Sequence, residues 1–252
     1  MTPSKLQELY ASRAADDGYV GDSQSCRAKT VCKIVEAFPA GKGLDVGSAD
    51  GSVLAALTTQ HQISAVDICA KFFGSLKDKG YVDAVQCDIQ TEPLPHDSGS
   101  FDWVVCAECL EHVVDTDHVL AEINRVLKPG GRFILTVPNI RTPIGLAMLI
   151  VGYPPMLGAR YRSGHVRDFT LSTARIALQN NGFKVEKLFG TEFMSPYGFH
   201  LSWLARLFPA WSSTIVFSCT KLKAVHYDLE AVVSTEMHGR PASLGPRPCT
   251  GL

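Results

Sequence analysis

The stretch Gly43-Leu44-Asp45-Val46-Gly47-Ser48-Ala49-Asp50-Gly51-Ser52-Val53-Leu54 decides the fold. It predicts a short buried strand, a turn of small residues and the start of a helix. Such a turn brings backbone N–H groups and a helix N-terminus to one place, where a ligand can approach the backbone closely. Asp45 adds a carboxylate, which would repel a pyrophosphate and attract an ammonium or sulfonium group. The sequence therefore predicts a ligand that carries positive charge.

Two further apolar runs, residues 63–67 and 84–89, each carry an acid near the end. Asp67 lies about twenty residues beyond the glycine turn, where the acid of a nucleotide-binding α/β unit binds the ribose hydroxyls. Asp88 can accept a hydrogen bond from an adenine amino group, and Ile89 can cover the ring. A ligand with a positive charge, a ribose and an adenine is S-adenosylmethionine, and we expect it to bind here.

Motifs recur in order at the ends of the expected strands. They are DVGSADG (45–51), VD (66–67), CDI (87–89), FDWVV (101–105), LEHV (110–113), LKPGG (127–131) and VPN (137–139). Each motif alone is weak, but the series resembles the class I S-adenosylmethionine-dependent methyltransferases, in particular their small-molecule, type 11-like branch. The resemblance covers residues 29–223. The middle glycine of the usual glycine triplet is replaced by Ala49, and we expect a slightly tighter turn rather than a lost site.

The alternation of strands and helices predicts the fold class. It is α/β: a doubly wound, mostly parallel, seven-stranded Rossmann-like sheet with helices on both faces and an antiparallel last strand. Helices are expected over 26–38, 117–127 and 171–180, with 128–131 as a stop signal, and the last two strands over 183–193 and 212–221. We expect a cap segment at 1–25, a methyltransferase domain at 26–223 with the insert 140–166 as a substrate lid, and a tail at 224–252.

Composition agrees with one globular domain that is not directed at nucleic acid. The chain has 252 residues, 46% of them hydrophobic, and a formal net charge of -1. The absence of a global basic field does not favour a nucleic-acid partner. The N-terminus lacks the apolar stretch of a signal peptide, and the eight cysteines suggest no close pairing pattern. We expect buried free thiols, a cytoplasmic location, and a monomer or homodimer.

The resemblance implies a cofactor-binding set. Asp45, Gly47, Ser48 and Gly51 would surround the methionine part, Asp67 and Ile68 the ribose, Asp88 and Ile89 the adenine, and Cys106 and Ala107 would run beneath the sulfonium. Methyl transfer needs mainly alignment and exclusion of water, but a hydroxyl acceptor must also lose a proton. His112 and His165 are the candidate catalytic bases.

A second reading of this region is a divalent-metal site. In Glu108-x-x-Glu111-His112, a helical backbone would place two carboxylates and an imidazole on one face. The cluster resembles that of ubiquinone-biosynthesis O-methyltransferases and of terminal-ribose methyltransferases of small RNAs, in which His165 has a counterpart. The candidate metal set is Glu108, Glu111, His112 and His165. The alternative, that these residues brace the strand–helix junction or face the substrate, is favoured over a metal.

The acceptor side is apolar. The insert 140–164 and the connection 196–211 are rich in aliphatic and aromatic residues, which suits a lid over a hydrophobic acceptor, a peripheral membrane contact helped by Arg160, Arg162 and Arg167, or a dimer interface. The favoured function is methyl transfer to a small apolar or aromatic acceptor, at oxygen, by in-line displacement. The alternatives are a metal-assisted hydroxyl methyltransferase of the ubiquinone or small-RNA type, a NAD-dependent dehydrogenase, and a non-catalytic cofactor-binding protein similar to the MetW-like proteins.

Overall fold

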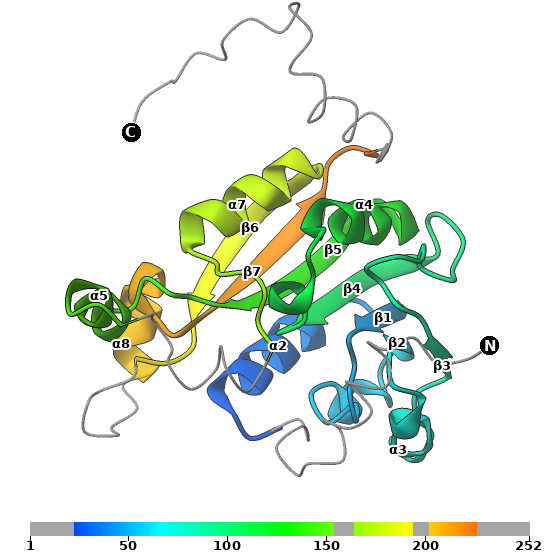
Figure 1. Cartoon of the computed structure of the whole chain (residues 1–252). Coiled ribbons are helices and arrows are strands. Elements are labelled where there is room, and N and C mark those ends of the chain that lie inside the picture. Colours follow the sequence, from blue (N-terminus) through cyan, green and yellow to red (C-terminus); the bar gives the residue numbers. More distant parts are fainter. Residues whose placement is uncertain (1–22, 154–163, 194–201, 226–252) are drawn as a thin grey trace, which may run out of the picture.

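The computed structural model of the chain describes residues 23–153, 164–193 and 202–225. Within these residues, seven strands form one sheet in the order β3-β2-β1-β4-β5-β7-β6 (Figure 1). The strands are β1 (Lys42–Val46), β2 (Gln62–Asp67), β3 (Asp83–Gln86), β4 (Phe101–Ala107), β5 (Leu127–Pro138), β6 (Phe183–Gly190) and β7 (Thr214–Lys221). The pairs from β3 to β5 are parallel, whereas β7 runs antiparallel to both β5 and β6. This confirms the predicted sheet and its antiparallel last strand.

Helices cover both faces of the sheet. In the described residues they are α2 (Cys26–Glu36), α3 (Phe73–Asp78), α4 (Thr116–Val126), α5 (Pro143–Ile150), α7 (Leu171–Asn180) and α8 (Ser202–Leu207), with short 3₁₀ turns η2 (Ala55–Leu57), η3 (Ala70–Phe72), η4 (Leu110–His112) and η5 (Pro209–Trp211). Successive side chains of β4 enter opposite cores, since Val104 packs with residues of α4 and α7 whereas Val105 packs with Val31 and Val35 of α2. The sheet is thus buried on both sides, as a doubly wound fold requires.

The turn after β1 differs from the predicted start of a helix. Gly47, Ala49 and Gly51 have φ values of 71, 45 and 76°, all in the left-handed region. Because a right-handed helix needs negative φ at every residue, the chain makes successive turns and forms only the three-residue η2. The expected helix N-terminus at this turn is therefore wrong.

Two predicted boundaries also move. Residues 128–131 do not form a separate stop, because β5 begins at Leu127, directly after α4, and continues through Gly130 at a φ of 72°. The third strand ends at Gln86, so Asp88 and Ile89 lie in the turn that follows it.

Parts of the predicted organisation lie outside the described residues. These are 1–22 of the cap segment, 154–163 of the insert with Arg160 and Arg162, 194–201 of the apolar connection, and 226–252 of the tail. The domain limits stay a prediction. In the described part the seven cysteines are free thiols, as expected, and the cytoplasmic location stays a prediction. No helix among these residues combines the length and apolar character needed to cross a bilayer.

Candidate active site

Three acids meet at the carboxyl edge of the sheet because the strands that carry them are neighbours. β1 lies between β2 and β4 in parallel register, with Asp45 opposite Ala65 and Val105. Asp67 ends β2, and Glu108 follows β4 directly. This edge is where open α/β sheets bind their ligands.

Asp45 is a buried carboxylate in crowded acidic surroundings. Its side chain accepts a hydrogen bond from the Tyr81 hydroxyl at 2.8 Å, and the residue is only 4% exposed. Burial raises the pKa of Asp45 to about 7, and the nearby charges of Asp67 and Asp50 raise it further, against the lowering effect of the Tyr81 hydrogen bond. A positively charged ligand would relieve this repulsion and favour the ionised carboxylate.

Asp67 holds the glycine turn against the end of β2. Its Oδ2 accepts the Ala49 N–H and its Oδ1 accepts the Cys69 N–H, both at 2.8 Å. Burial raises the pKa of Asp67, while these two hydrogen bonds lower it. Because each carboxylate oxygen has a second lone pair, Asp67 can fix the turn and still accept a ribose hydroxyl.

The glycines of the turn are required by packing as well as by backbone conformation. A Cβ at Gly47 would lie 2.6 Å from the Cys109 Sγ, and one at Gly51 would lie 2.6 Å from Leu76 and 2.8 Å from Tyr81. Ser48 differs, because its buried hydroxyl has no hydrogen-bond partner among the described residues. A buried polar atom without a partner is costly, so a polar ligand at this turn would satisfy it. Together with the acids of the edge, it fits the ammonium and carboxylate of S-adenosylmethionine.

The other expected cofactor residues differ in how much of the side chain is available. Asp88 is buried, and its Oδ1 accepts the Gln90 N–H at 3.1 Å. Ile68 and Ala107 are partly exposed, Ile89 is partly buried against the core, and Cys106 is fully buried within it. The adenine and sulfonium contacts therefore stay predictions, and Cys106 offers backbone rather than side chain.

Glu108 points away from the place that helical spacing predicts. Its φ is +51°, and η4 begins only at Leu110. Its Oε1 accepts a hydrogen bond from the Thr136 hydroxyl at 2.9 Å, and its Oε2 lies 3.4 Å from Arg27 of α2. The left-handed residue thus turns this carboxylate toward β5 and α2, and it does not join the candidate metal ligands.

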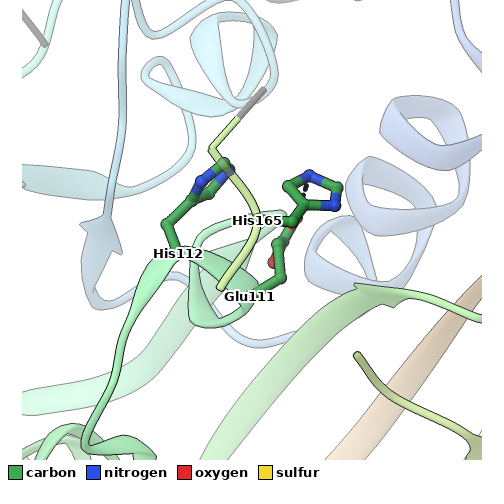
Figure 2. Close-up of side chains that lie close together, drawn as sticks. All are labelled: Glu111, His112 and His165. Atoms are coloured by element: carbon green, nitrogen blue, oxygen red, sulfur yellow. Dashed lines mark ion pairs between the residues drawn. The ribbon is translucent and has the colours of Figure 1, made fainter. Parts of the chain in front are cut away.

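Glu111, His112 and His165 do come together, although 53 positions separate the first and last of the chain segments that carry them. Each offers a ligand atom, and these atoms lie within 4.8 Å of one another (Figure 2). The backbone carbonyl of Glu111 accepts the N–H groups of Val166 and Arg167 at 2.9 and 3.1 Å, which fixes the segment that carries His165.

The charges in this cluster are not balanced within the protein. Glu111 is fully buried, and apart from its own backbone N–H, neither carboxylate oxygen has a hydrogen-bond partner among the described residues. His165 Nε2 lies 3.8 Å from Glu111 Oε1, and the rings of His112 and His165 pack edge to face at 4.9 Å. Burial raises the pKa of Glu111 well above its ordinary value and lowers that of His165. His165 is therefore neutral near pH 7, the form that accepts a proton or a metal.

Sequence reasoning missed several partners in this site. Cys106 and Cys109 form a C-x-x-C pair, and the hydrogen bond between their thiols, with burial, raises the pKa of Cys109 well above its ordinary value. That spacing was visible in the sequence. Tyr81 and Arg27 gave no signal, because each meets its acid across a long sequence separation.

Comparison with known proteins agrees with this geometry. Residues 44–135 match a family model described as a methyltransferase domain. The ubiquinone biosynthesis O-methyltransferase of Xanthomonas oryzae pv. oryzae is 31% identical over 155 residues, which are 58% of this chain and 64% of that protein. The chain thus spans less than two thirds of this relative's length.

Solved structures share the fold at low identity. The 1,6-didemethyltoxoflavin-N1-methyltransferase of Burkholderia thailandensis, solved with S-adenosylhomocysteine, has a TM-score of 0.60 at 20% identity and covers 86% of this chain and 88% of its own. A putative methyltransferase from Haloferax volcanii, solved with the activator Trm112, has a TM-score of 0.62 at 18% identity and covers 86% and 98%. Residues 44–135 belong to the methyltransferase-domain family, and the chain has the class I S-adenosylmethionine-dependent methyltransferase fold.

Proposed function

We propose that this protein transfers a methyl group from S-adenosylmethionine to a hydroxyl oxygen of a small apolar or aromatic acceptor. The observation that carries the proposal is the pair of buried carboxylates, Asp45 and Asp67, at adjacent strand ends inside the matched methyltransferase domain. Choice of oxygen is supported by the relative named as an O-methyltransferase. We further propose that the protein acts in the cytoplasm.

The residues divide the work of the transfer between holding the cofactor and preparing the acceptor. S-adenosylmethionine supplies a methyl group on a sulfonium that is already a good leaving group. Asp45 and the Ser48 hydroxyl would bind the methionine part, and Asp67 the ribose. Neutral His165, with Glu111 3.8 Å from its Nε2, would accept the acceptor's proton, and His112 would orient the hydroxyl.

Calorimetry with S-adenosylhomocysteine tests the binding half of this proposal. We expect binding by the wild-type chain, and at least about a tenfold loss of affinity in Asp67→Asn, since the charge-assisted bonds that hold the turn are weakened. Asp97→Asn, at an exposed acid, is the matched control and should bind normally. Equal affinity in all three proteins would contradict the assignment of Asp67.

Transfer of a labelled methyl group to catechol-type and other phenolic acceptors tests the catalytic half. We expect His165→Gln to lower kcat while leaving the affinity for S-adenosylhomocysteine unchanged. Binding without transfer to any acceptor would instead favour the non-catalytic alternative.

A metal-assisted version of the same reaction has a specific observation in its favour. Glu111, His112 and His165 place three ligand atoms within 4.8 Å of one another, and the Glu111 carboxylate is buried without a partner residue. A divalent ion there would bind the acceptor oxygen and lower its pKa.

Calorimetry with Mg²⁺ and Zn²⁺ separates the two versions. The metal version predicts binding by the wild-type chain, loss of it in Glu111→Gln, and normal binding in Glu186→Gln, an exposed control. Full transfer activity in chelator, with no ion bound, would leave His165 as a simple base.

A further inference from the structure

The described residues expose large apolar side chains mainly in two short stretches. Nine of the fourteen exposed large hydrophobic residues in the described part lie in 146–153, at α5, or in 203–211, at α8 and η5. They are Leu146, Leu149, Ile150, Val151, Tyr153, Trp203, Leu207, Phe208 and Trp211. Ile150 is 86% exposed and Trp203 is 61% exposed. Such a concentration indicates a surface that is covered in use, and we name it the apolar face.

Both stretches leave the sheet at the edge that carries the candidate active site. Pro138 of β5 pairs with Thr214 of β7, so the chain enters α5 and leaves η5 at the same point. Asn139 fastens the two together, because its Nδ2 donates to the carbonyls of Ala210 and Ser212 at 3.0 and 2.8 Å. Figure 1 shows α5 and α8 at the same end of the molecule, beyond β6 and β7.

The chemistry of the apolar face identifies its occupant. Residues 140–153 and 202–213 contain Arg141 and Arg206 and no acidic residue. The acid that adjoins the second stretch is Glu192, whose backbone carbonyl accepts the Ser213 N–H. Two tryptophans and a tyrosine beside long aliphatic side chains are typical of protein surfaces that enter the headgroup region of a bilayer. Arginines at the rim would add attraction to anionic lipids.

We propose that the apolar face docks on the surface of an anionic lipid bilayer, so that the carboxyl edge of the sheet faces the membrane. The proposal rests on the proposed function for its purpose, since an apolar acceptor dissolved in the bilayer would then reach His165 without crossing water. The physical claim about docking stands on the two exposed stretches alone. No span is involved, because docking would insert side chains and short helices only into the headgroup region.

Flotation with vesicles tests the docking. The full chain is mixed with vesicles of phosphatidylcholine alone, or of phosphatidylcholine with phosphatidylglycerol, and the bound fraction is measured. We expect binding to the anionic vesicles, and at least about a tenfold fall in Ile150→Gln/Trp203→Gln, since these side chains would no longer gain by burial. Ile176→Gln changes an equally large exposed residue on α7 and should bind like the wild-type chain; it is 56% exposed.

The charge contribution needs its own pair of variants. Arg141→Gln/Arg206→Gln should lose the preference for anionic vesicles, while Lys187→Gln, on β6 outside the apolar face, should keep it. Equal binding by wild type and Ile150→Gln/Trp203→Gln would overturn the proposal. So would an absence of vesicle binding together with a dimer that the same double variant dissociates, because the occupant would then be a second copy of the chain.

A cofactor measurement keeps this proposal separate from the proposed function. S-adenosylhomocysteine affinity of Ile150→Gln/Trp203→Gln should equal that of the wild-type chain, which also shows that the variant is folded. Vesicle binding by a chain that does not bind S-adenosylhomocysteine would overturn the methyltransferase proposal and leave the docking surface standing.

Discussion

Replacing Asp45 by asparagine should stabilise the cofactor-free protein while weakening cofactor binding. The pKa of this carboxyl rises from 3.8 to about 7 on folding because the side chain is buried. Between these two values the folded chain binds more protons than the unfolded chain, so ionisation of Asp45 lowers stability progressively as the pH rises from about 4 to 7. Above pH 7 the full cost is present.

The magnitude follows from the pKa difference. At about 1.36 kcal/mol per unit, ionised Asp45 costs at most about 4 kcal/mol at pH 8 and about 2 kcal/mol at pH 5. Asp45→Asn removes this charge, and the amide oxygen can still accept the Tyr81 hydroxyl. Any cost of the new amide N–H₂ is the same at both pH values. The gain in the free energy of unfolding should therefore be larger at pH 8 than at pH 5 by about 2 kcal/mol.

Urea unfolding of both proteins at pH 5 and pH 8 measures that difference. Asp102→Asn is the control of opposite sign, because hydrogen bonding to Lys128 lowers the pKa of the Asp102 carboxyl, so its ionised form stabilises the folded state. Affinity for S-adenosylhomocysteine should fall at least about tenfold in Asp45→Asn and stay unchanged in Asp102→Asn. A stability difference that is equal at both pH values, or an Asp45→Asn protein with normal affinity, would refute the reasoning.

Three other substitutions test the turn and the cluster. Ala49→Gly should raise the urea midpoint by roughly 0.5 kcal/mol of stability, since relief of a left-handed alanine at φ 45° exceeds the added entropy of the unfolded chain; a lower midpoint would mean that the methyl group packs usefully. Gly47→Ala should lower the free energy of unfolding by about 1–3 kcal/mol, because its Cβ would lie 2.6 Å from the Cys109 Sγ, and thermal unfolding should show a matching drop in Tm. Glu111→Gln should be at least as stable as the wild-type chain in chelator at pH 8, since it removes a buried carboxyl of raised pKa; urea unfolding that shows clear destabilisation would mean that the carboxylate has a partner in solution.

The sequence was informative where a pattern repeats over several residues. Alternation of buried runs with amphipathic helices predicted the sheet, and the placement of Asp45 and Asp67 at strand ends followed from it, because parallel strands bring their carboxyl ends to one edge. The order of the helices α4 and α7 was equally readable, since Asp115 and Thr170 cap them in the usual way.

Features set by one residue or by a distant partner could not be read in this way. Ala49 was expected to tighten a turn before a helix, but its positive φ, between two glycines, abolishes the helix altogether. Glu108 was placed beside Glu111 by helical spacing, yet a single left-handed residue and the hydroxyl of Thr136, 28 positions away, turn it to the other side. A periodic rule assumes one backbone conformation throughout, so it fails where the conformation changes within the motif.

The structure also changes what a motif acid means. By its position, Asp67 is the ribose ligand, but in the cofactor-free chain its two oxygens already hold the N–H groups of Ala49 and Cys69. Loss of binding in Asp67→Asn would thus follow from either a lost ribose contact or a loosened turn. Ser48→Ala resolves this, because the Ser48 hydroxyl bonds no described residue: the turn has nothing to lose, and any fall in affinity must come from the ligand.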